Sequence, residues 1–188
     1  MSAVETAGRA PDWGRPPRIW WHRLRGDRAS GLPEDRATIA QLRRCHTPLE
    51  AFFVPATLLL LPASARAEGG QDAALEIFGA VAVVLAHIRE DVTDQHVARA
   101  IGREQIGAPE TALVSELRFR HLVQLETVGE LMTGMRRLVK QLRGRANVDD
   151  LARSMLWWFR GENTRRRWAF DYYAAGIADP SVAATDRT

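Results

Sequence analysis

Cysteine is almost missing from this sequence, which contains a single one, Cys45. One thiol excludes an internal disulfide and any zinc site built from cysteines alone. The composition therefore fits a reducing compartment, and we expect the protein in the cytoplasm. Without a partner thiol, Cys45 is predicted to be a small, buried apolar residue.

Lysine is equally scarce, because Lys140 is the one basic residue among 26 that is not arginine. The formal net charge is +3 and the isoelectric point is near 9.7. Guanidinium groups stay charged at any working pH and present a planar fork of donors suited to phosphate, so this choice of cation favours polyanionic partners. A genome rich in G and C would also raise the arginine content, and both explanations stay open.

No apolar run reaches the ~20 residues that a membrane span requires. One apolar stretch, residues 52–61, follows Arg43 and Arg44 and precedes residues 63–67, which are small except for Arg66, an order that imitates a signal peptide. The apolar core of a signal lies within the first ~15–30 residues, whereas this stretch starts at residue 52. We therefore predict a core helix here, without export or membrane contact.

The common catalytic signatures are also lacking. There is no Gly-x-Ser-x-Gly elbow and no glycine loop that would cradle phosphate, and the adjacent Cys45 and His46 are a weak nucleophile signal. One cluster has the residue types of metal ligands, namely His87, Glu90, Asp91, Asp94 and His96. The same types are ordinary where one helix ends and the next is capped, which is the interpretation we favour. We expect no enzyme activity, no metal and no cofactor.

Strand patterns are absent as well, since no run alternates apolar and polar residues between hairpin turn signals. Helical spacing prevails, and residues 72–89 are apolar nearly all the way round, which a helix tolerates only when it is surrounded. We predict an all-α bundle of about eight helices with short connections. Its single domain spans residues 18–175, between flexible tails at 1–17 and 176–188.

Capping signals predict where the helices begin. Thr47 with Glu50, and Thr127 with Glu130, have the spacing of a capping box. Gly144 and Gly161 lie where helices should end. Further helices are expected around Trp20, from Pro33 to Arg44, and from near Asp94, Ser115, Asn147 and Asn163.

The segment 131–143 has two distinct faces. At ~100° per residue, one narrow sector is apolar and predicts a core contact, and it consists of Leu131, Met135, Leu138 and Leu142. The opposite side is a row of cations that no acidic residue shares, formed by Arg136, Lys140 and Arg143 with Arg137 alongside. Solvated faces usually mix signs. We therefore interpret these cations, expected to lack partners within the chain, as phosphate contacts, with a plain solvated face as the alternative.

The last two helices carry a second signal. If Val148, Ala152, Met155 and Phe159 face the core, then Trp157 points outward between Arg153 and Arg160. Such a tryptophan could contact a partner, pack against another helix or stack on a base, and the first two are favoured. Arg165, Arg166 and Arg167 lie in a first helical turn, where cations oppose the helix dipole unless an anion arrives. Arg167 can instead be structural, because Asp171 follows four residues later.

Short motifs run through the whole chain. They are Trp20-Trp21-x-x-Leu24, Gly26-Asp27-Arg28, Leu42-Arg43-Arg44-Cys45-x-Thr47-Pro48, Leu113 to Arg120, Asn147 to Arg153, Trp157-Trp158, and Arg165 to Tyr173. In their order and spacing over residues 18–175 they resemble the small subunit of the type I-E CRISPR Cascade effector complex, the CasB family.

The resemblance implies an α-helical, non-catalytic subunit that works with other Cascade subunits in antiviral defence. It would dimerise inside the complex, lie beside the guide RNA and help to hold target DNA once the R-loop opens. The basic surface of the family carries over, as phosphate contacts, to Arg43, Arg44, Arg118, Arg120, Arg136, Arg137 and Arg165–Arg167. The alternative is a helical protein-interaction scaffold that does not contact nucleic acid directly.

Overall fold

The structure, a computed structural model, describes residues 15–26, 31–63, 75–102 and 112–174. These ranges are mainly helical, which confirms the all-α class. The helices are α1 (Pro17–Arg25), α2 (Arg36–Arg44), α3 (Pro48–Ala51), the 3₁₀ helix η1 (Pro55–Leu59), α5 (Glu76–Ala86), α6 (Val97–Ile101), α7 (Glu116–Val123), α8 (Val128–Gln141), α9 (Val148–Leu156) and α10 (Asn163–Ala174).

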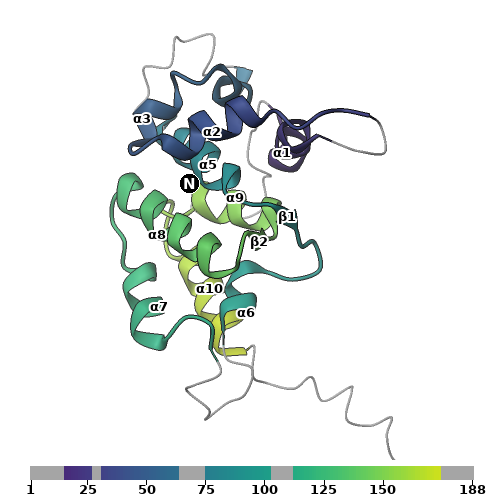
Figure 1. Cartoon of the computed structure of the whole chain (residues 1–188). Helices are drawn as coiled ribbons and strands as arrows, with labels where there is room; N and C mark the ends of the chain where they lie inside the picture. Colours follow the sequence, from purple (N-terminus) through teal and green to yellow (C-terminus); the bar gives the residue numbers. More distant parts are fainter. Residues whose placement is uncertain (1–14, 27–30, 64–74, 103–111, 175–188) are drawn as a thin grey trace, which may run out of the picture.

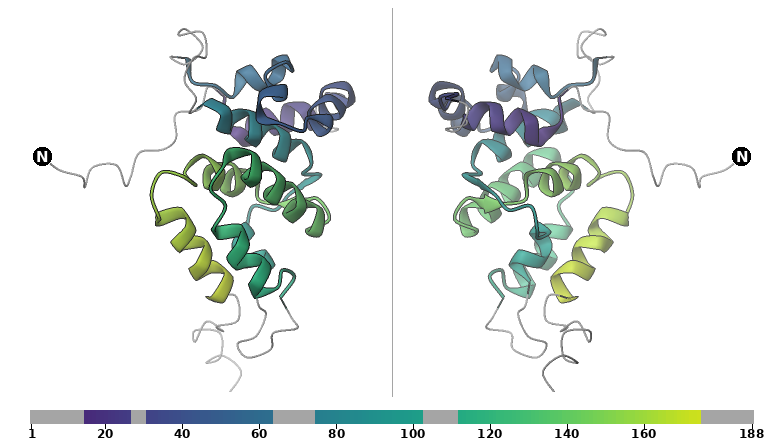
Figure 2. Two further views of the ribbon diagram at one scale, coloured as in Figure 1. Left: turned by 90° about the vertical axis from the view of Figure 1, so that its left-hand side faces the viewer. Right: turned by 90° about the vertical axis from the view of Figure 1, so that its right-hand side faces the viewer.

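Helix α5 forms the centre of the core. Its residues from Ala80 to Leu85 have no exposed surface. This confirms a central helix within the apolar segment 72–89, of which residues 72–74 lie outside the described ranges. It packs against α2, α3, α8 and α9. Figures 1 and 2 show α1, α2 and α3 gathered at one end of the molecule, α8 and α9 in the middle, and α6, α7 and α10 at the other end.

Most helix starts follow the local capping signals. The hydroxyl of Thr127 accepts a hydrogen bond from the Glu130 amide, and the Glu130 carboxylate accepts one from the Thr127 amide. Thr47 caps α3, and Asn147 caps α9. Ser115 precedes α7, and α10 starts at Asn163, both as expected.

Two predicted starts are displaced. The second helix begins at Arg36 rather than Pro33, because the Asp35 carboxylate caps it through the Thr38 amide. The helix expected from Asp94 begins at Val97. The amide of Val97 donates a hydrogen bond of 2.8 Å to the carboxylate of Asp150, which is distant in sequence. The start of α6 is therefore capped by a tertiary contact instead of by a neighbouring residue.

A short parallel bridge joins β1 (Glu90–Asp91) to β2 (Arg145–Ala146). Two residues are too few to show an alternating pattern, so this bridge was not predicted. It places the chain that leaves α5 beside the chain that leaves α8. Asp91 strengthens the junction, since its carboxylate accepts from the Val148 amide at 2.9 Å and pairs with Arg18 at 2.7 Å.

The expected tails lie almost wholly outside the described residues. Pro17 is an exception, because it is the first residue of α1 and is buried. Within the ranges given above, no helix has the length and apolar character needed to cross a membrane.

Candidate nucleic-acid interface

A cleft of about 780 Å³ opens between the end of α2, the end of α5 and one side of α8. We call it the basic cleft, because none of the described residues that line it is acidic. Its basic lining residues are Arg43, His46, His87, Arg89, Arg136, Arg137, Lys140 and Arg143.

The two faces of α8 explain why several of these cations meet. Leu131, Met135 and Leu138 are buried in the core, as predicted for the apolar stripe. Its fourth member, Leu142, lies just after the helix and is half-buried. Arg137 and Lys140 are exposed on the other side. The sequence therefore predicted the basic side of α8, except that Arg143 lies beyond the end of the helix at Gln141, with a φ of +57°.

Arg89 belongs to the same cleft but was missed by sequence reasoning. Its amide donates 2.7 Å to the carbonyl of Gly144, just beyond α8. Gly144 has a φ of +82°, and a Cβ there would lie 3.0 Å from Cγ of Arg89. The glycine thus lets the Arg89 side chain pass close to the backbone. Arg89 reaches the cleft because the bridge between β1 and β2 places it beside Gly144. This contact joins residues far apart in sequence, so no local sequence pattern predicts it.

Arg136 and Arg43 are tied to helix ends. Arg136 donates 3.0 Å to the carbonyl of Cys45 and 3.4 Å to that of Arg43, at the end of α2. Arg43 in turn donates 2.9 Å to the carbonyl of Ala86, the last residue of α5. A cation at a helix C-terminus satisfies free carbonyls and complements the dipole. The expectation that the row lacks partners within the chain is therefore wrong for Arg136, whereas phosphate contact stays a prediction.

His87 lies at the basic cleft, where burial and nearby cations both disfavour its protonated form. Burial, followed by the charges of Arg136, Arg43 and Arg25, lowers its pKa to about 4. Burial also lowers the pKa of Arg43, and the charges of Arg25 and Arg89 act in the same direction. An anion bound here would offset this repulsion between cations.

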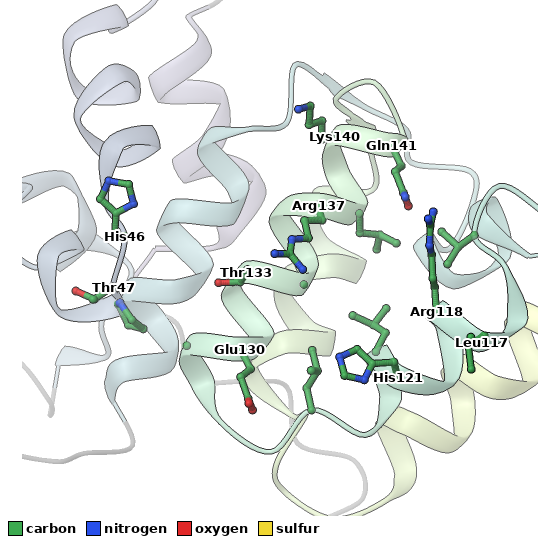
Figure 3. A pocket seen from close by; sticks show the side chains of 17 residues that line it. His46, Thr47, Leu117, Arg118, His121, Glu130, Thr133, Arg137, Lys140 and Gln141 are labelled. Atoms are coloured by element: carbon green, nitrogen blue, oxygen red, sulfur yellow. The ribbon is translucent and has the colours of Figure 1, made fainter.

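A second hollow of about 1160 Å³ lies beside the cleft, and we call it the α7–α8 groove. Figure 3 shows Arg118 and His121 of α7 on one side, His46 and Thr47 on the other, and α8 between them. Gly134 of α8 lets the side chains of Leu122 and Leu125 pack close to the helix backbone, since a Cβ there would lie 2.9 Å from Leu125 and 3.0 Å from Leu122. The two hollows share four lining residues, His46, Thr133, Arg137 and Lys140. Arg118, which lines the α7–α8 groove, therefore lies on a surface continuous with the basic cleft.

The remaining predicted arginines lie elsewhere. Arg44 is exposed but lines neither hollow. Arg120 pairs with Glu116 at 2.6 Å, and a hydrogen bond with Tyr173 together with that carboxylate raises the pKa of Arg120. Arg165 and Arg166 are on α10, where Arg166 pairs with Glu162.

Arg167 is structural, but through a different partner from the one expected. Its guanidinium lies 2.9 Å from the carboxylate of Asp150 and donates 2.6 Å to the hydroxyl of Ser154. Asp171, the predicted partner, lies 3.0 Å from Nδ1 of His96 instead. Arg167 therefore holds α10 on α9.

Trp157 does not stand free on the surface. Helix α9 ends at Leu156, so the turn that follows buries Trp158 completely and leaves Phe159 38% exposed, against the expectation that Phe159 faces the core. Trp157 is half-buried against the core, and Arg160 lies over its ring at 4.8 Å. This geometry favours the packing interpretation of the three that the sequence left open.

The candidate metal ligands do not converge. Asp91 is engaged by Arg18 and by the start of α9, and His96 pairs with Asp171. Across the described ranges, no group of three histidine, cysteine or acidic residues is placed to hold a metal ion. Asp91 and His96 thus make contacts at helix ends, in line with the interpretation favoured from the sequence.

Comparison with known proteins adds the following findings. A family model described as CRISPR-associated protein Cse2 matches residues 38–173. No curated protein matches the chain. Solved structures share the fold, among them the following three. A chain of E. coli Cascade bound to a PAM-containing double-stranded DNA target is 18% identical, covers 87% of this chain and 97% of its own, and has a TM-score of 0.60. CasB from Thermus thermophilus is 23% identical, with coverages of 86% and 97% and a TM-score of 0.61. A structure of a CRISPR-associated protein of the Cse2 family, also from Thermus thermophilus, has the same identity and coverages and a TM-score of 0.59.

Proposed function

Because this chain belongs to the family of CRISPR-associated protein Cse2, we propose that it is the non-catalytic small subunit of a type I-E Cascade complex and binds nucleic-acid backbone through the basic cleft. One observation carries the proposal. Four exposed cations, Arg89, Arg137, Lys140 and Arg143, line one cleft, and its described lining residues include no carboxylate.

The chemistry of the cleft suits phosphate rather than a particular base sequence. Arginine and lysine contact phosphate oxygens without reading base edges, so such binding is independent of sequence. The role follows from this: the subunit would stabilise the guide RNA and target DNA of an R-loop, while base pairing supplies the specificity. No reaction is part of the proposal, and the candidate metal ligands Asp91 and His96 are engaged in helix-end contacts.

The partners follow from the family and from the shared fold. The E. coli chain of similar fold comes from Cascade bound to double-stranded DNA. By analogy, we propose other Cascade subunits, guide RNA and target DNA as the partners of this chain. We further propose that two copies pair within the complex and that the complex works in the cytoplasm. Residues 18–175 of this chain would form one domain, to which Pro17 of α1 is added, between the two tails.

The proposal is tested in the assembled complex with the double variant Arg137→Glu and Lys140→Glu. Both side chains are exposed, so the fold should persist while two attractive phosphate contacts become repulsive. The matched control is Arg99→Glu with Arg153→Glu, two exposed arginines that line neither hollow. Filter retention of a target duplex is measured for both complexes.

We expect weaker retention with the cleft variant than with the control, at equal copurification of the subunit. Equal retention by the cleft variant and the unmodified complex would show that the cleft is ordinary solvated surface. The scaffold alternative would then be the better account.

A further inference from the structure

The α7–α8 groove differs from the basic cleft because its floor is apolar. Leu122, Leu125 and Leu138 form that floor, and Leu117 stands at its edge with 80% of its surface exposed. The polar lining carries cations, since Arg118, Arg137 and Lys140 reach it from both helices. The acidic residue of the lining, Glu130, is already occupied by the capping box of α8. A phosphate group alone would make no apolar contact with the leucines of the floor.

A ligand that fits this lining has an apolar face and carries negative charge. An unstacked nucleotide meets both conditions, because its base is flat and apolar on both faces and its phosphate is anionic. An acidic amphipathic helix also meets them. The shared lining favours the nucleotide. His46, Thr133, Arg137 and Lys140 border both hollows, so a strand with phosphates in the basic cleft continues directly into the groove.

We propose that the α7–α8 groove receives an unstacked base of the single strand whose phosphates lie in the basic cleft. The inference rests on the proposed function and extends it from phosphate to base. The groove volume of about 1160 Å³ is ample for a nucleotide, since small-ligand sites commonly measure about 300–1,000 Å³. Because leucines offer no hydrogen-bond pattern, the contact accepts any base.

The experiment compares two probes on the full-length protein. One is a fluorescent oligothymidylate, and the other is a strand of the same length in which every nucleotide is abasic. The phosphate count is the same in both, so binding to phosphate alone predicts equal affinity. We expect the abasic strand to bind at least about fivefold more weakly, which corresponds to ~1 kcal/mol, the gain from burying roughly 40 Å² of apolar surface against the leucines at about 25 cal/mol per Å².

Two variants locate the effect. Gly129→Leu fills the groove, because a Cβ at Gly129 meets nothing within 4 Å. Leu117→Ser removes an exposed apolar group from its edge. The matched control is Leu49→Ser, a leucine on α3 that is 60% exposed and lines neither hollow. Both groove variants should reduce the difference between the probes to less than about twofold, whereas the control should retain it.

The outcomes separate the two proposals. Equal affinity of the unmodified protein for both strands overturns the groove inference and leaves phosphate binding intact. Failure of both strands to bind in a salt-dependent way defeats the proposed function itself. A preference for bases that survives in both groove variants also overturns the inference, because the base then lies elsewhere. If these variants instead lose incorporation into the complex with the preference intact, the groove is a protein-docking site.

Discussion

Replacing Arg136 by methionine should destabilise the fold, whereas the same change at Arg137 should not. The two residues are adjacent on α8 and both line the basic cleft. Arg136 is half-buried and ties α8 to the end of α2 through the carbonyls of Cys45 and Arg43. Arg137 is exposed. The pair thus compares a tethered cation with a solvated one of the same type.

The expected loss of stability in Arg136→Met follows from these contacts. A hydrogen bond from a charged donor contributes about 1.5–3 kcal/mol. The bond to Cys45 is 3.0 Å long, whereas that to Arg43 is 3.4 Å and weak, so Arg136→Met should cost about 2 kcal/mol. At about 2–4 °C per kcal/mol for a chain of this size, Tm should fall by about 4–8 °C. Arg137→Met should change stability by no more than about 0.5 kcal/mol.

Thermal unfolding and the affinity for oligothymidylate are measured side by side on both variants. Arg137→Met should keep its Tm and lose affinity, with the log–log salt slope smaller by about 0.7 because one phosphate contact is lost. Equal Tm values for the two variants would refute the assignment of Arg136 as a structural tie.

Three further predictions concern contacts that position the site. Arg167→Met should cost about 2–3 kcal/mol in thermal unfolding, because it leaves the carboxylate of Asp150 buried without its cation, and an unchanged Tm would contradict this. The low pKa of His87, about 4 in the fold against 6.5 when unfolded, means that protonation favours the unfolded chain as pH falls from 6.5 toward 4. Unfolding free energy should therefore drop by roughly 2 kcal/mol more over this window than in His87→Gln, and parallel pH profiles would disprove the effect. Gly144→Ala should cost about 1–2 kcal/mol, from the positive φ and the contact with Arg89, and denaturant unfolding with no loss would rule out that strain.

Sequence reasoning performed best where the cause is local. Thr127 and Glu130 satisfy each other's amides within one helical turn, so their spacing alone predicted the start of α8. The faces of α8 followed from its period, because one helix buries one stripe. The central place of α5 followed in the same way from its uninterrupted apolar composition.

The contacts that were missed all depend on distant partners. Arg136 meets Cys45, 91 residues away, and Val97 meets Asp150 across 53. Neither pairing leaves a trace in the local pattern, which is why Arg136 was expected to be free and α6 was expected to start too early. Arg89 was overlooked for the same reason, since only the bridge between β1 and β2 brings it to α8.

The salt dependence of binding tests the central claim most directly. The affinity of the full-length protein for oligothymidylate is measured by fluorescence anisotropy over a range of salt concentrations. Four exposed cleft cations, at ~0.7 per phosphate on a single strand, predict a log–log slope of about −3. The double variant Arg137→Glu with Lys140→Glu should lower the slope to about −1.4 or less in magnitude. A slope near zero for the unmodified protein, or the same slope for both proteins, would contradict a phosphate-binding role for the basic cleft.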